Sequence, residues 1–286
     1  MEQVIQALIS GILSGGIYAL ISVGLALIFG VVGLVNFAHG EFLMLSMYIA
    51  YWVYYFIKLE PYESLLINLV LMATVGYIVY KVIMTRVLEA DHSMQMLLTL
   101  GLSMVLQNLA LMLFKADYRN VRIDITTDVI NIGFTNLSTA RVLAFIVAIG
   151  ASVALYLFLQ KTYTGVAMKA VAQDGKAAKL MGINIKKIYG QAFIIGTMLV
   201  GLAGVLMSPM YSVFPTIGAN FSTLAFIVVV LGGLSSIPGA IFGGILIGIV
   251  ESMAGYLLGP AYQQAAYFLL FILVLIFKPS GIFGRE

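Results

Sequence analysis

An amide, an imidazole and a carboxylate occur together near the start of the chain, in the stretch NFAHGE from Asn36 to Glu41. Long apolar segments lie on both sides, so these polar side chains interrupt an otherwise oily region. Ionisable groups at membrane depth are costly and usually functional, which predicts that Asn36, His39 and Glu41 line a translocation path. The alternative is a structural turn, in which Asn36 caps a helix, Gly40 relieves the bend and His39 hydrogen-bonds to Glu41.

A second candidate for the wall or gate of a path lies in the last long apolar stretch, 188–277. Glu251 is its only charged residue. Gly232 and Gly233 precede Pro238, and this combination favours a bend between two helices. We therefore add Gly232, Gly233 and Glu251 to the residues predicted to line the path, with helix bonding near an interface as the alternative for Glu251.

Other polar residues in apolar segments are assigned structural roles. Gln107 and Asn108 are expected to hydrogen-bond between helices. The chain has only two histidines, His39 and His92, and they lie in different segments, so no metal site is expected. The absence of cysteine excludes disulfides, thiolate nucleophiles and cysteine-based zinc sites.

The elements that must position these groups are membrane helices. The chain has 286 residues, of which 62% are hydrophobic and 9% are charged, whereas soluble domains are about 25% charged. The composition predicts an all-α integral membrane protein with a single domain over 1–286 and eight to ten membrane helices, nine being the preferred number. Some are expected to be short or broken. The apolar segments are 4–29, 42–57, 64–84, 94–114, 142–160, 190–208, 222–235, 239–258 and 262–277.

The distribution of lysine and arginine sets the expected orientation. The stretch 161–187 holds six lysines against one acid, which places it in the cytoplasm. Counting from there puts 115–141 outside, the N-terminus outside and the C-terminus inside. The aromatic run at 48–56 is expected to form an interfacial belt near the outer surface.

Glycines recur at a spacing of four residues, as in the pairs Gly11 and Gly15, Gly239 and Gly243, and Gly244 and Gly248. Small residues at this spacing allow helix backbones to approach closely in lipid. The pattern predicts tight packing within one subunit, with an interface between subunits as the alternative.

The longest polar interval, 161–189, is predicted to form two short helices at the cytoplasmic surface. The first begins near Thr164, which could cap it; Asp174 caps the second, and Gly182 ends it. One interpretation is an amphipathic element lying on lipid headgroups, and the other is a docking element for a cytoplasmic partner, favoured by its many alanines. The residues expected to carry docking are Lys169, Ala172, Asp174, Lys176, Ala178 and Gly182.

Four stretches resemble one known family over nearly the whole chain. They are SGGIYALISVGLALIFGVVGLVNFAHGEFLML, LLTLGLSMVLQN, AMKAVAQDGKAAKLMGINIKKI and VVLGGLSSIPGAIFGGILIGIVES. These are similar to the LivH family of permease subunits in ABC importers for branched-chain amino acids. The resemblance implies a membrane permease that moves hydrophobic amino acids inward by alternating access and is not itself an enzyme.

The resemblance also implies partners and a location. They are a second, homologous permease, two cytoplasmic ATPase subunits that dock on the coupling segment 161–189, and an extracytoplasmic substrate-binding protein. ATP and magnesium would be bound by the ATPase, and this chain has no G-x-x-x-x-G-K-[ST] phosphate loop and no cofactor of its own. The expected location is the bacterial cytoplasmic (inner) membrane, and nucleic acid is not an expected partner.

Three alternatives remain at this point. The same machinery could carry urea or short amides. A proton-coupled secondary transporter could use His39, Glu41 and Glu251, although no inverted pair of similar halves is obvious in the sequence. An intramembrane serine hydrolase is least favoured, since no serine lies in a nucleophile-type motif.

Overall fold

The computed structural model describes residues 2–88, 90–121, 123, 125, 128–131 and 136–284. Helices dominate it, because a helix satisfies its own backbone hydrogen bonds in lipid. The α-helices are α1 (Glu2–Val32), α2 (His39–Ile57), α3 (Leu65–Val82), α4 (His92–Phe114), α6 (Thr139–Lys161), α7 (Tyr163–Gln173), α8 (Gly175–Leu180), α9 (Ile185–Met207), α10 (Ile217–Gly232), α11 (Ile237–Leu257) and α12 (Gln263–Phe277). Two 3-10 helices are η1 (Met84–Arg86) and η2 (Pro260–Tyr262), and β1 (Val129–Asn131) pairs antiparallel with β2 (Asn136–Ser138).

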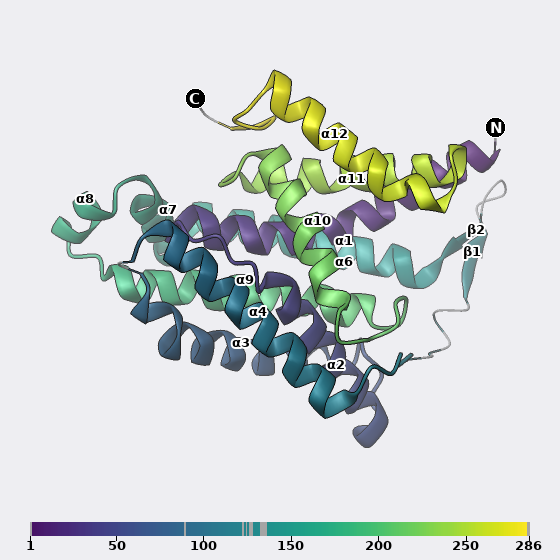
Figure 1. Ribbon diagram of the computed structural model, residues 1–286, viewed down its shortest axis with the longest axis horizontal. Coiled ribbons are helices and arrows are strands. Elements are labelled where there is room, and N and C mark those ends of the chain that lie inside the picture. The colour runs from purple at the N-terminus through teal and green to yellow at the C-terminus, as the bar shows by residue number, and fades with distance from the viewer. Residues whose placement is uncertain are drawn as a thin grey trace.

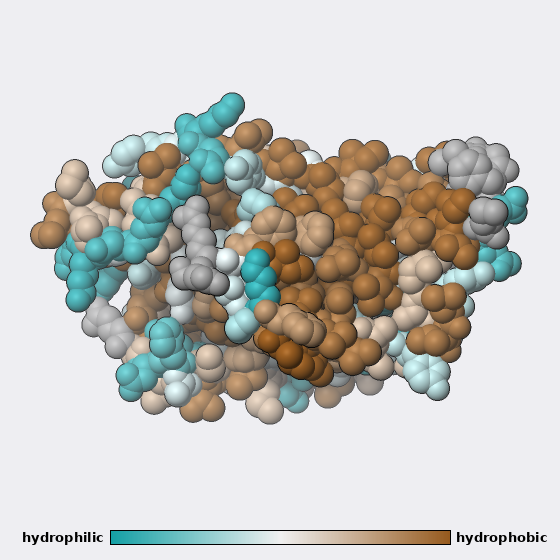
Figure 2. All heavy atoms as spheres, turned by 90° about the horizontal axis from the view of Figure 1, so that it is seen from above, coloured by the Kyte–Doolittle hydropathy of each residue, from teal (hydrophilic) through white to brown (hydrophobic). Residues whose placement is uncertain are grey.

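The predicted all-α membrane fold is confirmed. Seven helices of the described chain are long and apolar enough to cross a membrane; besides these, α10 is a shorter apolar helix of 16 residues and α2 has 19 residues. Most of them run along the long axis of the molecule (Figure 1). Apolar side chains cover the middle of the face in Figure 2, and hydrophilic ones gather mainly toward its two ends.

The helices α2 and α10 each follow a break in the chain rather than a plain surface turn. Residues 33–38 leave the end of α1 and run back along the bundle, and the His39 Nε2–H group donates a hydrogen bond of 3.0 Å to the Ile21 carbonyl oxygen. Ile21 lies about three turns before the end of α1 at Val32. α2 therefore begins inside the bundle. The segment 208–216 likewise follows α9 and precedes α10, which begins earlier than the predicted 222.

The long helix α1 packs against α11 through facing glycines. A Cβ atom on Gly15 would lie 2.6 Å from the Cα atom of Ile245, and one on Gly11 would lie 2.7 Å from the Gly248 carbonyl oxygen. The residue numbers rise along α1 as they fall along α11, so the two helices are antiparallel. The close packing within one subunit that the glycine spacing predicts is thus present between these two helices.

We expect Gly15→Val to destabilise the protein by more than about 2 kcal/mol, because overpacking against a helix backbone cannot be relieved by a rotamer change. Thermal unfolding of the detergent-solubilised protein, followed by fluorescence-detected size exclusion, measures the effect. The matched control is Gly150→Val in α6, where an added Cβ meets nothing within 4 Å. Equal melting temperatures for the two variants would contradict the packing argument.

Two sets of three helices, α1 to α3 and α9 to α11, run in opposite directions. α1 and α9 lie side by side and run in opposite directions (Figure 1). α1 is followed by a break, α2 and α3, whereas α9 is followed by a break, α10 and α11. α2 and α3 pack on α9, while α10 and α11 pack on α1. The molecule therefore contains two three-helix units, α1 to α3 and α9 to α11, in inverted orientation, which was not obvious in the sequence.

The end of the molecule opposite α7 and α8 is held by aromatic and cationic side chains. Arg119 lies over the rings of Tyr51 and Trp52, 5.3 and 5.0 Å from their centroids, and Tyr48 stacks on Phe114 with centroids 4.3 Å apart. The aromatic run 48–56 is thus partly internal packing, since Tyr48 is buried while Phe56 is 72% exposed.

Candidate functional site

The polar break between α1 and α2 is buried. Asn36, His39 and Glu41 are each at most 2% exposed. The Asn36 side-chain oxygen accepts a hydrogen bond of 3.1 Å from the Ala38 N–H, so it stabilises the turn; it does not cap α2 as expected, because the cap position is Ala38. His39 bonds to the Ile21 carbonyl, and the Glu41 carboxylate accepts a hydrogen bond of 3.1 Å from Ser103 in α4.

The expected local hydrogen bond between His39 and Glu41 is absent from the described chain, because each side chain bonds to a different helix. One polar atom of each residue has no partner within the described chain: Asn36 Nδ2, His39 Nδ1 and Glu41 Oε2. Buried polar atoms without partners are uncommon, and they usually bind a water molecule, an ion or a ligand. The break thus combines a structural turn with unsatisfied polar groups.

The broken helices α2 and α10 meet at this level. An added Cβ on Gly218 would lie 2.6 Å from Glu41 Oε2, and one on Gly40 would overlap the Gly218 carbonyl oxygen. Ser222 of α10 joins the two elements, since its hydroxyl accepts a hydrogen bond of 2.7 Å from the Gly40 N–H and donates one of 3.1 Å to the Phe37 carbonyl. We call Gly40, Glu41, Gly218 and Ser222 the helix junction.

Gly232 and Gly233, which were also predicted to line the path, lie away from the helix junction. Gly232 is the last residue of α10, about 20 Å along the helix from the junction. Gly233 has a φ of 104°, a left-handed conformation that favours glycine. The C-terminal segment holds this end, because the N–H groups of Ile282 and Phe283 donate to the carbonyls of Leu231 and Gly232 at 2.8 and 3.1 Å.

A cavity of about 750 Å³ opens beside these glycines, at the end of the bundle where α7 lies. Its wall includes Gly30 of α1, Lys169 of α7, Gly233, and Phe283 of the C-terminal segment. The coupling segment and the turn between α10 and α11 therefore share one cavity wall.

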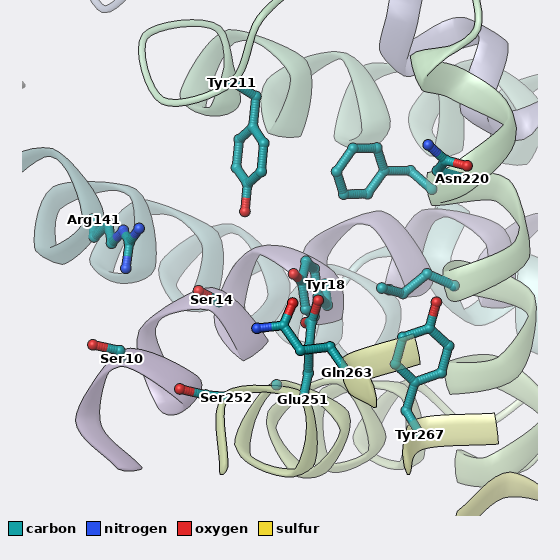
Figure 3. Close-up of a pocket in the computed structure, with 13 residues that line it drawn as sticks. Ser10, Ser14, Tyr18, Arg141, Tyr211, Asn220, Glu251, Ser252, Gln263 and Tyr267 are labelled. Carbon is teal, nitrogen blue, oxygen red and sulfur yellow. The ribbon is translucent and has the colours of Figure 1, made fainter. Parts of the chain in front are cut away.

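Glu251 lies at the other end of the bundle, in a second cavity of about 350 Å³ drawn in Figure 3. The wall also contains Tyr18 of α1, Arg141 of α6 and Tyr211 of the break before α10. These three residues were not predicted from the sequence. A signal was present in α1, where Ser10, Ser14 and Tyr18 follow one another at four-residue spacing and all line the cavity.

The six predicted path residues thus fall at three levels along the bundle: Glu251, the break at Asn36, His39 and Glu41, and the pair Gly232 and Gly233. Gln107 and Asn108 join none of them. The Asn108 amide donates to the Met104 carbonyl of its own helix rather than to a neighbouring helix. Among the described residues, no group of three histidine, aspartate or glutamate side chains is placed to hold a metal ion.

The segment 161–189 forms two short helices, as predicted, that project from one end of the molecule (Figure 1). The cap of α7 is Thr162 rather than Thr164, because Thr162 has the extended backbone of a capping residue and its hydroxyl accepts a hydrogen bond from the Gly165 N–H at 3.0 Å. Asp174 caps α8 as expected. Gly182, with a φ of 83°, follows the end of α8.

The residues expected to dock a partner differ in exposure. Ala172, Asp174, Lys176 and Gly182 are exposed, whereas Lys169 is half-buried and donates a hydrogen bond of 2.8 Å to Gln160. Ala178 is 5% exposed, so it positions α8 and cannot form a docking surface. Two apolar side chains that sequence analysis did not select stand out, Leu180 at 89% and Met181 at 82% exposure. We call Leu180 and Met181 the apolar tip.

Asp174 holds α8 in place through two hydrogen bonds, since one carboxylate oxygen accepts from the Lys176 and Ala177 N–H groups at 2.8 and 3.0 Å. We expect Asp174→Ala to destabilise this turn by about 1 kcal/mol. Hydrogen exchange of residues 175–181 should become faster, while exchange in α7 stays unchanged. Asp174→Asn is the control because asparagine caps equally well, and an equal acceleration in both variants would contradict the capping role.

The chain is similar in sequence to known transport proteins. Residues 7–277 match the family model described as the permease component of branched-chain amino acid transport systems. The chain is 31% identical to the high-affinity branched-chain amino acid transport system permease protein BraD of Pseudomonas aeruginosa, over 98% of this chain and 96% of the relative. It is 31% identical to the LivH permease protein of Escherichia coli over the same shares of the two chains.

A more distant relative is the probable branched-chain amino acid transport permease protein LivH of Methanocaldococcus jannaschii, with 28% identity over 96% of this chain and 91% of the relative. No solved structure matches significantly. The family match and the near full-length similarity show that this multi-pass membrane protein belongs to the family of permease components of branched-chain amino acid transport systems, whose members are transport subunits rather than enzymes.

Proposed function

We propose that this chain is the permease subunit of an ATP-driven importer that carries branched-chain amino acids inward by alternating access. The observation that carries the proposal is the family match over residues 7–277, joined to the lysine-rich helix pair α7 and α8 at one end of the molecule. The energy source would be a separate chain, because this one has no phosphate-binding loop.

The path in this proposal connects the two cavities through the helix junction. The outer cavity contains Glu251, the junction contains Glu41 next to Asn36 and His39, and the inner cavity contains Gly233. Broken helices with non-helical backbone inside the bundle are a recurring device of transporters, because irregular backbone is tolerated only where protein or a cavity surrounds it. The unpartnered atoms of Asn36, His39 and Glu41 support this placement.

Coupling in this proposal runs from α7 and α8 to the inner cavity. An ATPase bound to the apolar tip would move these helices when it closes on ATP. Lys169 of α7 and the turn at Gly233 line the same cavity, so that movement would reshape its wall. The alternative is an amphipathic element resting on lipid headgroups, to which Leu180 and Met181 beside Lys176 and Lys179 are also suited.

The proposed partners are two cytoplasmic ATPase subunits, a second related permease and an extracytoplasmic binding protein that supplies most of the selectivity. The proposed location is the bacterial cytoplasmic membrane, with 161–189 on the cytoplasmic side as the lysine distribution predicts. ATP and magnesium would be bound by the ATPase subunits alone.

The nearest alternative is the same machinery with urea or short amides as solute. Uptake of labelled leucine into membrane vesicles, challenged with unlabelled isoleucine or with urea, separates the two. The proposal expects isoleucine to suppress the signal and urea to leave it unchanged. Suppression by urea alone would reject the amino acid as the solute.

A further inference from the structure

The outer cavity holds an acidic and a basic side chain that are not paired with each other. Glu251 comes from α11 and Arg141 from the first turn of α6, and both line the cavity in Figure 3. Neither forms an ion pair within the described chain, where the one ion pair joins Arg119 to Asp117. An acid and a base that share a cavity without contact leave room for a ligand that bears both charges.

The surroundings of the two charges differ in a way that suits an amino acid. The hydroxyls of Tyr18 and Tyr211 and the Glu251 carboxylate line the same cavity, so this part of the wall carries several oxygen atoms (Figure 3). Oxygen acceptors around a carboxylate are suited to an ammonium group, which offers three N–H donors and no acceptor.

The remaining walls supply the other two contacts. The guanidinium of Arg141 offers a planar fork of donors that matches a carboxylate. Phe221 and Leu224 of α10 are 8% and 5% exposed and form an apolar wall in the same cavity. The cavity volume, about 350 Å³, falls in the range of sites that bind small molecules.

We propose that this cavity is a low-affinity receiving site for a zwitterionic aliphatic amino acid: Glu251 and Tyr18 hold its ammonium group, Arg141 holds its carboxylate, and Phe221 and Leu224 contact its side chain. The inference rests on the proposed function and extends it, because it assigns substrate contacts to the permease itself. Affinity is low because Arg141 is exposed and its charge is screened by water and salt. Weak binding suits a site that must pass the solute onward.

The test uses the complete transporter purified in lipid nanodiscs, without the binding protein, and detects weak ligands by saturation-transfer NMR. Three probes are compared: leucine, leucinamide, which lacks the carboxylate, and 4-methylpentanoate, which lacks the ammonium group. Glu251→Gln should weaken leucine and leucinamide by about tenfold or more and leave 4-methylpentanoate unchanged, because only the first two bear the ammonium group. Arg141→Gln should weaken leucine and 4-methylpentanoate and leave leucinamide unchanged.

Glu60→Gln, at an exposed carboxylate outside this cavity, is the control and should alter none of the three signals. A uniform loss for all probes in both cavity variants would show a merely structural role and overturn the inference. Absence of leucine binding to the unmodified complex would overturn it as well. Neither result would contradict the proposed function, which is tested separately by measuring ATP-dependent leucine uptake with the binding protein present.

Discussion

Replacing both Leu180 and Met181 with aspartate is expected to abolish ATP-driven leucine uptake while the chain remains folded in the membrane. The two side chains are 89% and 82% exposed, so they contribute little to the stability of the permease. Apolar side chains at the centre of a protein interface, by contrast, commonly cost more than about 2 kcal/mol each when they are replaced. Buried carboxylates in their place would add an uncompensated charge to the interface.

Two measurements separate docking from folding in this variant. Co-purification of the ATPase subunits should be lost, whereas size-exclusion elution and melting temperature of the permease should match those of the unmodified chain. The control exchanges the two apolar residues, as Leu180→Met with Met181→Leu, and should retain both uptake and ATPase binding. Full uptake by the double aspartate variant would exclude the apolar tip as the docking surface.

The second large effect is expected at the helix junction, where Gly40→Val should prevent correct assembly of the bundle. The added Cβ atom would overlap the Gly218 carbonyl oxygen and lie 2.6 Å from Ser222 Oγ and 2.7 Å from the Ser222 backbone nitrogen. Backbone atoms of α10 cannot move aside without unpacking that helix. The expected cost therefore exceeds about 3 kcal/mol, at the upper end of overpacking effects.

Fluorescence-detected size exclusion should show the Gly40→Val protein as aggregate, with little monodisperse material. Gly101→Val is the control, because an added Cβ at Gly101 in α4 meets nothing within 4 Å. That variant changes the same residue type in another membrane helix and should elute normally. A monodisperse Gly40→Val protein with an unchanged melting temperature would mean that the junction is looser than its geometry indicates.

The membrane class and the cytoplasmic element were predictable because they depend on local signals. Long apolar segments predict helices, and Asp174 and Gly182 mark the limits of α8 through capping chemistry. Exposure within that element was less predictable. Ala178 packs inward and Leu180 projects outward, since a six-residue helix carries too little periodicity to define its buried face.

The route of the chain at the break depends on tertiary contacts that sequence patterns do not report. NFAHGE is compatible with a surface turn or an internal break, and the distinction arises from the hydrogen bond between His39 and Ile21 and from the contact of Gly40 with Gly218. The presence of Glu251 and Arg141 in one cavity likewise depends on tertiary contacts, because the two residues are far apart in the chain and lie on different helices.

The two inverted three-helix units left only a weak trace in the sequence. Val-Gly-Leu-Ala occurs at 23–26 in α1 and again at 200–203 in α9, shortly before each break. The inverted arrangement removes one argument against a secondary transporter, because such carriers commonly contain inverted repeats. The family relationship over 98% of the chain is what favours a transport-system permease instead.

The most direct test of the central claim is leucine accumulation in proteoliposomes that contain the complex purified through this chain. ATP and magnesium are sealed inside the vesicles and the binding protein is supplied outside. The account predicts accumulation that requires ATP and persists when a protonophore collapses the proton gradient. Accumulation that persists without ATP and is lost with the proton gradient, from a preparation without ATPase chains, would contradict it.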